Sequence, residues 1–180
     1  MSGERFGIKV ERYSEEYRQR WDAFVEHSPR GTLFHTRAFL AYHPPGRFAD
    51  HSLLFFNEGS LLAILPAATR LRNEAGILCS HPGASFGGFV TRPHLSLAET
   101  DQVVATFLTH CNEQGYTGAQ LTLPPQVYFS YPDNHIEYAL YRHGFQYHKR
   151  EMTSVIALDA PFDFWPREAR RARRRAEKRG

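Results

Sequence analysis

The sequence predicts an α/β (α+β) fold, a mixed and mostly antiparallel sheet flanked by helices, followed by an Arg-rich C-terminal tail that is helical or disordered. Three observations lead to this prediction. Of the 180 residues, 42% are hydrophobic, which is ample for a packed core. Short segments with alternating or β-branched apolar residues indicate strands, and longer ones with apolar residues every three or four positions indicate helices. Two apolar runs joined by Asn57-Glu58-Gly59-Ser60 predict an antiparallel hairpin.

The N-terminal part predicts one strand and two helices. Apolar and polar residues alternate from Phe6 to Tyr13, which indicates a strand. Ser14 can cap a helix whose apolar stripe is Tyr17, Trp21, Phe24 and Val25, and Ser28-Pro29-Arg30-Gly31 ends it. A short helix is expected from Thr36 to His43, because Pro44-Pro45-Gly46 cannot continue one.

The middle of the chain predicts strands and then a long helix. The hairpin pairs Ser52 to Phe56 with Leu61 to Ala68, and further strands are expected at Ile77 to Cys79 and Gly88 to Thr91. Ser96-Leu97-Ala98-Glu99 matches a capping box, so a helix is expected from Ser96 to Gln114, stopped by Gly115.

The last predicted elements follow the long helix. A strand is expected from Ala119 to Leu123, ended by Pro124-Pro125, and a helix from Asn134 to His143. Phe145 to Leu158 has enough alternation and β-branching for one or two closing strands.

Charge separates a body from a tail, predicting a domain at residues 1–160 and a basic connecting segment at 161–180. Residues 167–180 hold eight basic and two acidic side chains, a net charge of +6, whereas residues 1–166 carry −3. The tail has no apolar residue beyond alanine and cannot bury itself. It is interpreted as a connecting helix, a phosphate-binding arm for RNA, or an end created by truncation.

Cysteine, histidine and hydropathy patterns limit the remaining classes. Cys79 and Cys111 lie in unrelated segments with no signal peptide ahead of them, so a cytoplasmic location without disulfides is predicted. The longest apolar run is interrupted by Pro66 and is too short to be a transmembrane segment. The ten histidines show no paired ligand spacing, so no metal site is predicted.

Gly83-Ala84-Ser85-Phe86-Gly87 matches the G-x-S-x-G pattern of a hydrolase nucleophile elbow. Such an elbow requires a helix directly after the serine, but Gly88 to Pro93 favours extended chain and turn. A Gly-rich bend is therefore favoured, and a serine hydrolase using Ser85 is kept as a less favoured alternative. The aromatic cluster around Tyr128, with Phe129, Tyr131, Tyr138, Tyr141 and Tyr147, is interpreted as core and rim packing rather than a ligand groove.

The predicted element order is that of the GNAT acyltransferase fold, and several segments resemble its FemA/FemB-like branch, the peptidoglycan-bridge type of aminoacyltransferase. The resembling segments are Trp21 to Val25, Gly31 to Leu40, Asp50 to Phe56, Leu65 to Ala67, Ser80 to Gly88, Pro124 to Tyr128, Glu137 to Leu140 and Met152 to Leu158. The Arg-rich tail resembles the segment that begins the family's connection to a second GNAT unit.

The resemblance implies that this chain is the first, acceptor-side unit of an N-acyltransferase whose second unit is absent. The junction Thr91-Arg92-Pro93-His94-Leu95-Ser96 lacks the Gly-rich loop that cradles the pyrophosphate of acetyl-CoA. No cofactor is therefore expected on this segment. The acyl donor, an aminoacyl-tRNA or an acyl-CoA, is expected at the second unit, with possible tRNA contact through the basic tail. The expected acceptor is an amine, and a peptidoglycan precursor in cell wall biogenesis is one candidate.

Six residues are predicted to line the substrate groove because they lie at expected strand ends and loops, where sites on such sheets are built. They are His81, Ser85, Gly87, Gly88, Tyr128 and Tyr138. No catalytic residue is assigned. The competing function is a nucleic-acid-binding module that acts through the basic tail.

Overall fold

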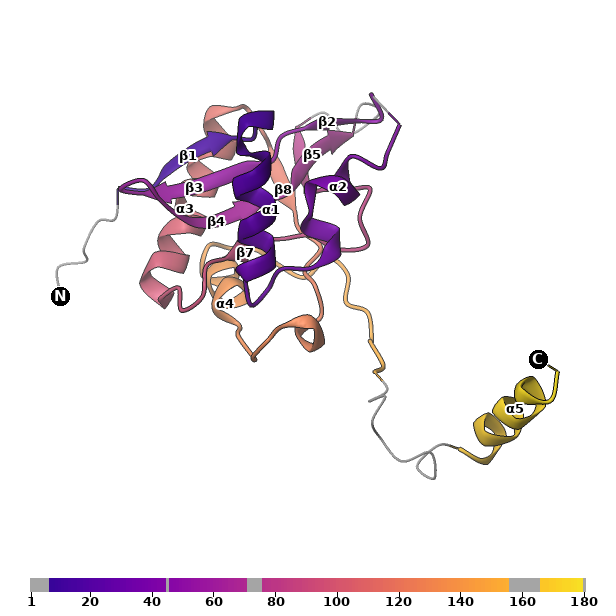
Figure 1. Ribbon diagram of the computed structural model, residues 1–180. Helices are drawn as coiled ribbons and strands as arrows, with labels where there is room; N and C mark the ends of the chain where they lie inside the picture. The colour runs from indigo at the N-terminus through magenta and orange to yellow at the C-terminus, as the bar shows by residue number, and fades with distance from the viewer. Residues whose placement is uncertain (1–6, 45, 71–75, 156–165, 180) are drawn as a thin grey trace. The chain divides into compact units, whose positions relative to one another are not determined.

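The computed structural model describes residues 7–44, 46–70, 76–155 and 166–179, which fall into two compact units, 1–148 and 149–180 (Figure 1). In the described part of the first unit, one sheet has the order β1-β3-β4-β7, that is Lys9–Arg12, Leu53–Asn57, Ser60–Leu65 and Val90–Thr91. The other has the order β2-β5-β6-β8, that is Phe48–Asp50, Ala67–Arg70, Ile77–Ser80 and Gly118–Gln120. Only β6 and β8 pair in parallel in these two sheets, so the predicted mixed, mostly antiparallel fold is confirmed.

The hairpin β3–β4 forms as predicted, but the chain after it does not stay in one sheet. Asn57 pairs with Ser60 across a turn in which Glu58 and Gly59 have φ of 48° and 79°, the positive values that a tight hairpin turn needs. The predicted single strand from Leu61 to Ala68 is wrong, because Pro66 has no N–H to continue the ladder. Strand β4 ends before Pro66, and β5 begins after it in the second sheet.

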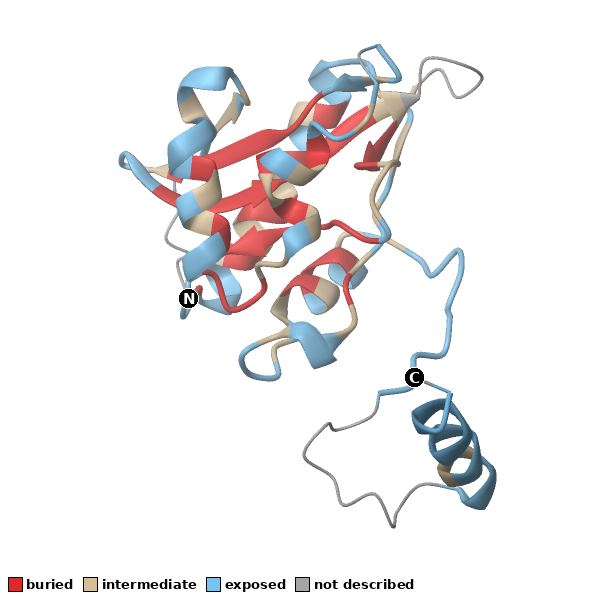
Figure 2. Ribbon diagram, turned by 45° about the vertical axis from the view of Figure 1, so that its right-hand side comes forward, coloured by how far each residue is buried: buried red, intermediate tan, exposed pale blue. Residues whose placement is uncertain are grey.

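Helices cover both faces of the first sheet. Helix α1, Arg18–His27, packs Trp21 and Val25 against one face, together with Leu54 and Ile64 of β3 and β4. Helices α3, Leu97–Glu113, and α4, His135–Arg142, contribute to the core on the other face, where Phe107 belongs to the same cluster as Phe55. Figure 2 shows the buried residues concentrated in the strands and in the helix sides that face them.

Helix α3 confirms the capping prediction. Ser96 is the N-cap; its Oγ accepts the N–H of Glu99 (3.2 Å), and the Glu99 carboxylate accepts the Ser96 N–H (2.9 Å). Gly115, with φ of 76°, follows the C-cap residue Gln114. The predicted helix at 134–143 is also confirmed as α4.

Several local predictions are corrected by the structure. The helix expected at 36–43 is reduced to α2, Arg37–Leu40, preceded by a 3₁₀ turn at Leu33–His35. Ser14 precedes another 3₁₀ turn, Glu15–Tyr17, and its side chain makes no cap hydrogen bond. A further 3₁₀ turn spans Gln126–Tyr128.

The predicted strands at the ends of the body are shorter or absent. The first strand is confined to β1, and its predicted start, Phe6, lies outside the described residues. The strand expected at 119–123 ends at Gln120; beyond it, the N–H and carbonyl of Thr122 bond to Ser80 and Gly87. The described residues 145–155 form no strand, and residues 156–158 of the predicted closing strands lie outside the description.

In the second unit, helix α5, Arg167–Glu177, buries none of its residues. An ion pair between Arg173 and Glu177 (2.7 Å) links successive turns of this helix. Throughout the described ranges, no helix is both long and apolar enough to cross a membrane.

Candidate functional site

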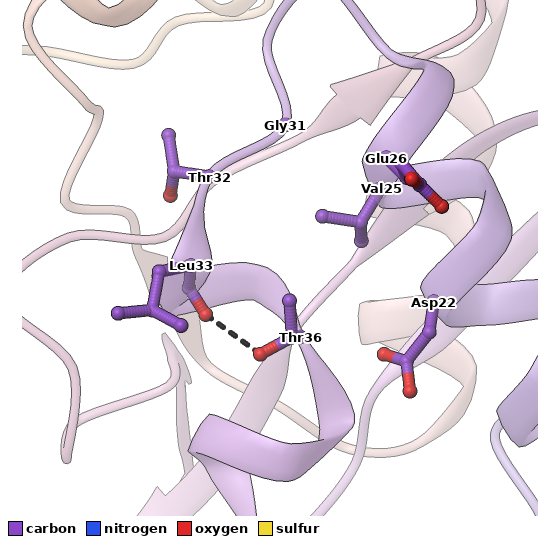
Figure 3. Close-up of a pocket in the computed structure, with 7 residues that line it drawn as sticks. All are labelled: Asp22, Val25, Glu26, Gly31, Thr32, Leu33 and Thr36. Carbon is purple, nitrogen blue, oxygen red and sulfur yellow. Dashed lines mark hydrogen bonds between the residues drawn. The ribbon is translucent and has the colours of Figure 1, made fainter.

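A pocket of about 440 Å³ lies between α1 and the chain that leads into α2 (Figure 3). We call it the acidic pocket. It is lined by Asp22, Val25, Glu26, Gly31, Thr32, Leu33 and Thr36. At Gly31, one of the lining residues, the chain passes so close to α1 that a Cβ there would lie 1.8 Å from the Val25 carbonyl oxygen. Only glycine fits there, so the sequence Arg30-Gly31 fixes how α1 meets the next turn.

The lining of the acidic pocket combines two carboxylates with apolar side chains. Asp22 and Glu26, one helical turn apart on α1, both face it, and its lining contains no basic side chain. Oδ1 of Asp22 accepts the backbone N–H of Arg37 (2.8 Å) at the start of α2. Thr36 donates its hydroxyl proton to the Leu33 carbonyl oxygen (2.8 Å), the bond drawn in Figure 3. This arrangement favours a ligand that has a positive charge and a small apolar part.

A second pocket, of about 170 Å³, lies between α2, β2 and the residue that follows β6. We call it the His81 pocket. It is lined by Arg37, Leu40, Ala41, His43, Pro44, Gly46, Phe48, Asp50 and His81. The backbone N–H of His81 donates to the Pro66 carbonyl oxygen (3.2 Å), which fixes the predicted site residue beside the break between β4 and β5. Burial lowers the pKa of His81 to about 4, so its ring is neutral at neutral pH.

Arg37 connects the two pockets through its backbone and side chain. Its backbone N–H bonds to Asp22, and its side chain pairs with Asp50, donates to Ser52 Oγ (3.1 Å) and lies 3.6 Å from the ring centroid of Tyr13. Burial acts to raise the pKa of Asp50, but the Arg37 guanidinium and hydrogen bonds from Ser52 outweigh it and hold the pKa below its usual value. Asp50 therefore stays ionised, and the ion pair fastens α2 to the sheet.

Ser85 and Gly87 of the G-x-S-x-G segment line neither pocket. Its first glycine reaches the wall of the His81 pocket, where the Gly83 carbonyl oxygen lies 2.9 Å from Nε2 of His43. Ser85 is exposed, and no helix begins between Ser85 and Leu97, so the helix that a nucleophile elbow needs directly after its serine is absent from these described residues. Gly87 donates its N–H to the Thr122 carbonyl oxygen (2.7 Å). Gly88 has φ of +85° and lies against the Leu123 side chain, 2.9 Å from where a Cβ would be. Both predicted glycines thus hold this bend against the chain beyond β8.

The predicted aromatic site residues are on the surface. Tyr128 and Tyr138 are 56% and 48% exposed, and Tyr131, Tyr141 and Tyr147 are exposed as well. Of the predicted core and rim packing, the core placement is wrong for these tyrosines. The Tyr128 ring lies 5.4 Å from that of Phe86, which brings it next to the segment from Ser85 to Gly88. Of the six predicted site residues, only His81 lines either pocket.

Sequence reasoning missed the other residues that line the pockets. Asp22 and Glu26 show a detectable signal, two carboxylates at i and i+4 on the polar side of an amphipathic helix. Arg37, His43 and Asp50 show no such signal, because separate elements bring them together. In the described part of the chain, no group of three or more His, Cys, Asp or Glu side chains could hold a metal ion.

The N-terminus of α3 is occupied by the chain's own carboxylate. Glu99 accepts from the N–H and hydroxyl of Ser96 (2.9 and 2.8 Å) and pairs with Arg92 (2.7 Å). Burial acts to raise the pKa of Glu99, but these bonds outweigh it and hold the pKa below its usual value. A phosphate placed at this helix end would meet a negative charge.

Comparisons with known proteins add likenesses of fold only. No sequence model of a protein family matches the chain, and no curated protein matches it. A solved Thermus thermophilus protein, TTHA1254, is 17% identical, with 85% of this chain and 99% of that chain covered and a TM-score of 0.48. The aminoglycoside antibiotic 6'-N-acetyltransferase AAC(6')-IG of Acinetobacter haemolyticus is 15% identical over 84% of this chain and 99% of its own, with a TM-score of 0.45. The aminoglycoside N-acetyltransferase AAC(6')-Iy, solved in complex with CoA, is 12% identical over 83% and 94%, with a TM-score of 0.48.

Proposed function

We propose that this chain is the acceptor-side unit of an N-acyltransferase, which binds an amine and presents it for amide formation. The observation that carries the proposal is the acidic pocket, where Asp22 and Glu26 face a cavity with no basic side chain in its lining. An alkylamine is protonated at neutral pH and matches this charge, while Val25 and Leu33 suit its carbon chain. The FemA/FemB-like segments support a two-unit enzyme of this kind, and a cell-wall precursor amine is one such acceptor.

In this mechanism the first unit binds and orients the acceptor. The ammonium group must lose a proton before its nitrogen attacks the acyl carbonyl, and the oxyanion that then forms needs a hydrogen-bond donor. We assign the acyl donor, an aminoacyl-tRNA or an acyl-CoA, to a second unit. The predicted groove residues Ser85, Gly87, Gly88, Tyr128 and Tyr138 are proposed to form the surface along which the rest of the acceptor lies.

Butylamine tests the acidic pocket directly. Its ammonium form should shift the methyl NMR signals of Val25 and Leu33, and the combined Asp22→Asn and Glu26→Gln changes should weaken its binding about tenfold, because each exposed ion pair contributes about 0.2–1 kcal/mol. Asparagine can still accept the Arg37 N–H, so α2 keeps its start. Butanol, which has no charge, should shift these signals far less.

A matched control removes a carboxylate elsewhere. Glu113→Gln, at the exposed end of α3, should leave butylamine affinity unchanged. Equal affinity in the wild type and the double variant would show that the pocket does not recognise the amine by charge, and the proposal would fail.

The donor assignment predicts that this chain does not bind acetyl-CoA tightly. Glu99 fills the place at the start of α3 where a pyrophosphate would accept backbone N–H groups. Calorimetric titration with acetyl-CoA should therefore detect no micromolar affinity. Glu99→Gln keeps the cap but removes the charge, and should bind inorganic pyrophosphate more tightly than the wild type does. Micromolar acetyl-CoA binding by the wild-type chain would contradict the assignment.

A second candidate function is nucleic-acid binding through the tail. Its observation is α5, whose exposed basic residues are Arg167, Arg171, Arg173, Arg174 and Arg175, with Lys178 and Arg179 after it. Phosphate binding by such a helix weakens steeply as salt rises. Two results together would favour this function over acyl transfer. RNA binding should be salt-sensitive and lost when residues 167–180 are removed, and butylamine should not bind to the acidic pocket.

A further inference from the structure

A row of aromatic rings begins beside the acidic pocket and ends at the surface. Leu33 lines the pocket and is 66% exposed, and the next residue, Phe34, starts the row. The ring of Phe34 lies 4.5 Å from that of Phe86, and the Phe86 ring lies 5.4 Å from that of Tyr128. Phe39 packs edge-on against Phe34 at 4.9 Å. We call Leu33, Phe34, Phe86 and Tyr128 the aromatic ledge.

Hydrogen bonds of one buried histidine hold the ledge in place. His35, which follows Phe34, is 0% exposed. Its Nε2 donates to the carbonyl oxygen of Gly87 (3.1 Å), the residue after Phe86, because a carbonyl oxygen only accepts. Trp21 of α1 donates its indole N–H to the His35 carbonyl oxygen (2.8 Å). The ledge is therefore fixed to the helix that carries the two carboxylates, and a ligand need not order it on binding.

The outer end of the ledge is apolar surface that no described element covers. Tyr128 is 56% exposed, and its neighbour Val127 is 51% exposed. Exposed apolar side chains that lie together are typical of a binding surface, because covering them removes apolar area from water. Rings also pack well on rings, in offset or edge-to-face arrangements, so an aromatic group suits this surface.

The charges beside the ledge restrict what can cover it. Asp22 and Glu26 line the same pocket as Leu33, and the lining has no basic side chain. An anion on the ledge would be repelled by these carboxylates, and an uncharged hydrocarbon would gain nothing from them. A cation that carries a large apolar group matches both the pocket and the ledge.

We propose that the acceptor is an amine that carries an aromatic ring, with its ammonium group in the acidic pocket and its ring on the aromatic ledge. Leu33 belongs to both, so its side chain contacts the alkyl chain that joins the ammonium group to the ring. The ring packs against Phe34 and Tyr128. This inference rests on the proposed function, because the acidic pocket must bind an amine, but the contribution of the ledge can be measured separately.

Phenylalkylamines of increasing chain length, compared with butylamine, test the ledge. In NMR titrations of the wild-type chain, at least one of 2-phenylethylamine, 3-phenylpropylamine and 4-phenylbutylamine should bind about tenfold more tightly than butylamine, because its ring is removed from water. That ligand should also shift the ring signals of Tyr128. 4-Phenylbutyrate has the same ring with a negative charge and should not bind. Equal affinity of all four amines, or binding of 4-phenylbutyrate as tight as that of 4-phenylbutylamine, would overturn the proposal.

Substitutions at Tyr128 separate the ledge from the acidic pocket. Tyr128→Ser removes an exposed ring, so the phenylalkylamine should lose most of its advantage while the melting temperature and butylamine affinity stay unchanged. Tyr128→Phe keeps the ring and should keep the advantage. Tyr141→Ser, at a tyrosine of α4 that is 75% exposed, should change none of these.

The outcomes distinguish this inference from the proposed function. If butylamine binds but the advantage of the ring survives Tyr128→Ser, the ledge is not the site of the ring and this inference is wrong, while the proposed function stands. If no amine binds to the wild-type chain, both are wrong.

Discussion

The first unit is expected to lose several kcal/mol of its free energy of unfolding as pH falls from 6.5 to about 4. His35, His51 and His81 are 0%, 6% and 4% exposed, and desolvation by burial lowers the pKa of each to about 4. Each contributes about 3 kcal/mol when its pKa differs by this much between the folded and unfolded chains. Because a domain's total stability is about 5–15 kcal/mol, we expect acid unfolding within this window.

The free energy of unfolding falls at low pH because the folded and unfolded chains bind different numbers of protons. Between pH 6.5 and about 4 the unfolded chain takes up a proton at each of these histidines and the folded chain does not. The unfolded state therefore binds more protons, and the free energy of unfolding rises with pH across this range. The stabilisation is complete above the unfolded pKa and is lost as pH falls toward the folded one.

The contacts of His51 give a structural cause for the loss of stability at low pH. Its Nε2 lies 2.9 Å from Nε2 of His110, and its Nδ1 lies 3.0 Å from the Tyr116 hydroxyl. A bridge between two ring nitrogens holds a single proton, and a second one would place two N–H groups face to face. Protonation of both rings would therefore break the contact between α3 and the residue that follows β2.

Urea denaturation at a series of pH values, followed by circular dichroism, measures the effect. His81→Phe removes one titrating group and should reduce the loss by about 3 kcal/mol. His148→Gln changes an exposed histidine and should not alter it. A free energy of unfolding that stays constant from pH 7 to 4.5 would contradict the prediction. It would show that protonation of these histidines does not destabilise the folded state.

Sequence reasoning succeeded where the signal is local. The capping box at Ser96 and the turn at Gly59 each lie within four residues, and both form as predicted. Pro66 was visible as an interruption, but its consequence depends on a second sheet that receives β5. No local pattern shows that the chain changes sheets there, because β5 pairs with β2, nearly twenty residues earlier in the chain.

The site was less predictable for the same reason. The expected strand end predicts His81 as a site residue, and His81 does line a pocket, but His43 and Asp50 reach that pocket from different elements. The density of aromatic residues predicts core and rim packing for the tyrosines, but density does not tell which side of an element faces solvent. The acidic pocket depends on the close approach at Gly31, a backbone contact that no residue pattern encodes.

Asp133→Asn is expected to lower the free energy of unfolding by about 3–5 kcal/mol, the usual cost of leaving a buried charge without its partner. The Arg30 side chain is 2% exposed, and its Nη1 bonds to Oδ2 of Asp133 (3.2 Å) and to the Asp133 carbonyl oxygen (3.1 Å). The guanidinium also lies 4.3 Å from the centroid of the Phe129 ring. In the wild type the His135 backbone N–H donates to Oδ1 of Asp133 (2.8 Å), and the side-chain oxygen of asparagine can accept the same bond. The substitution therefore removes the charge and keeps this hydrogen bond.

Two comparisons show whether the ion pair itself is responsible. Asp101→Asn disrupts a more exposed pair with Arg142, whose side chains are 26% and 52% exposed, and should cost less than about 1 kcal/mol. Adding Arg30→Met to Asp133→Asn removes the unpaired charge and should recover part of the loss.

Because Arg30 directly precedes Gly31, Asp133→Asn should also weaken butylamine binding in the acidic pocket, although Asp133 does not line it. Urea denaturation measures the stabilities, and a loss no larger than that of Asp101→Asn would mean that Arg30 stays solvated enough to need no counter-charge.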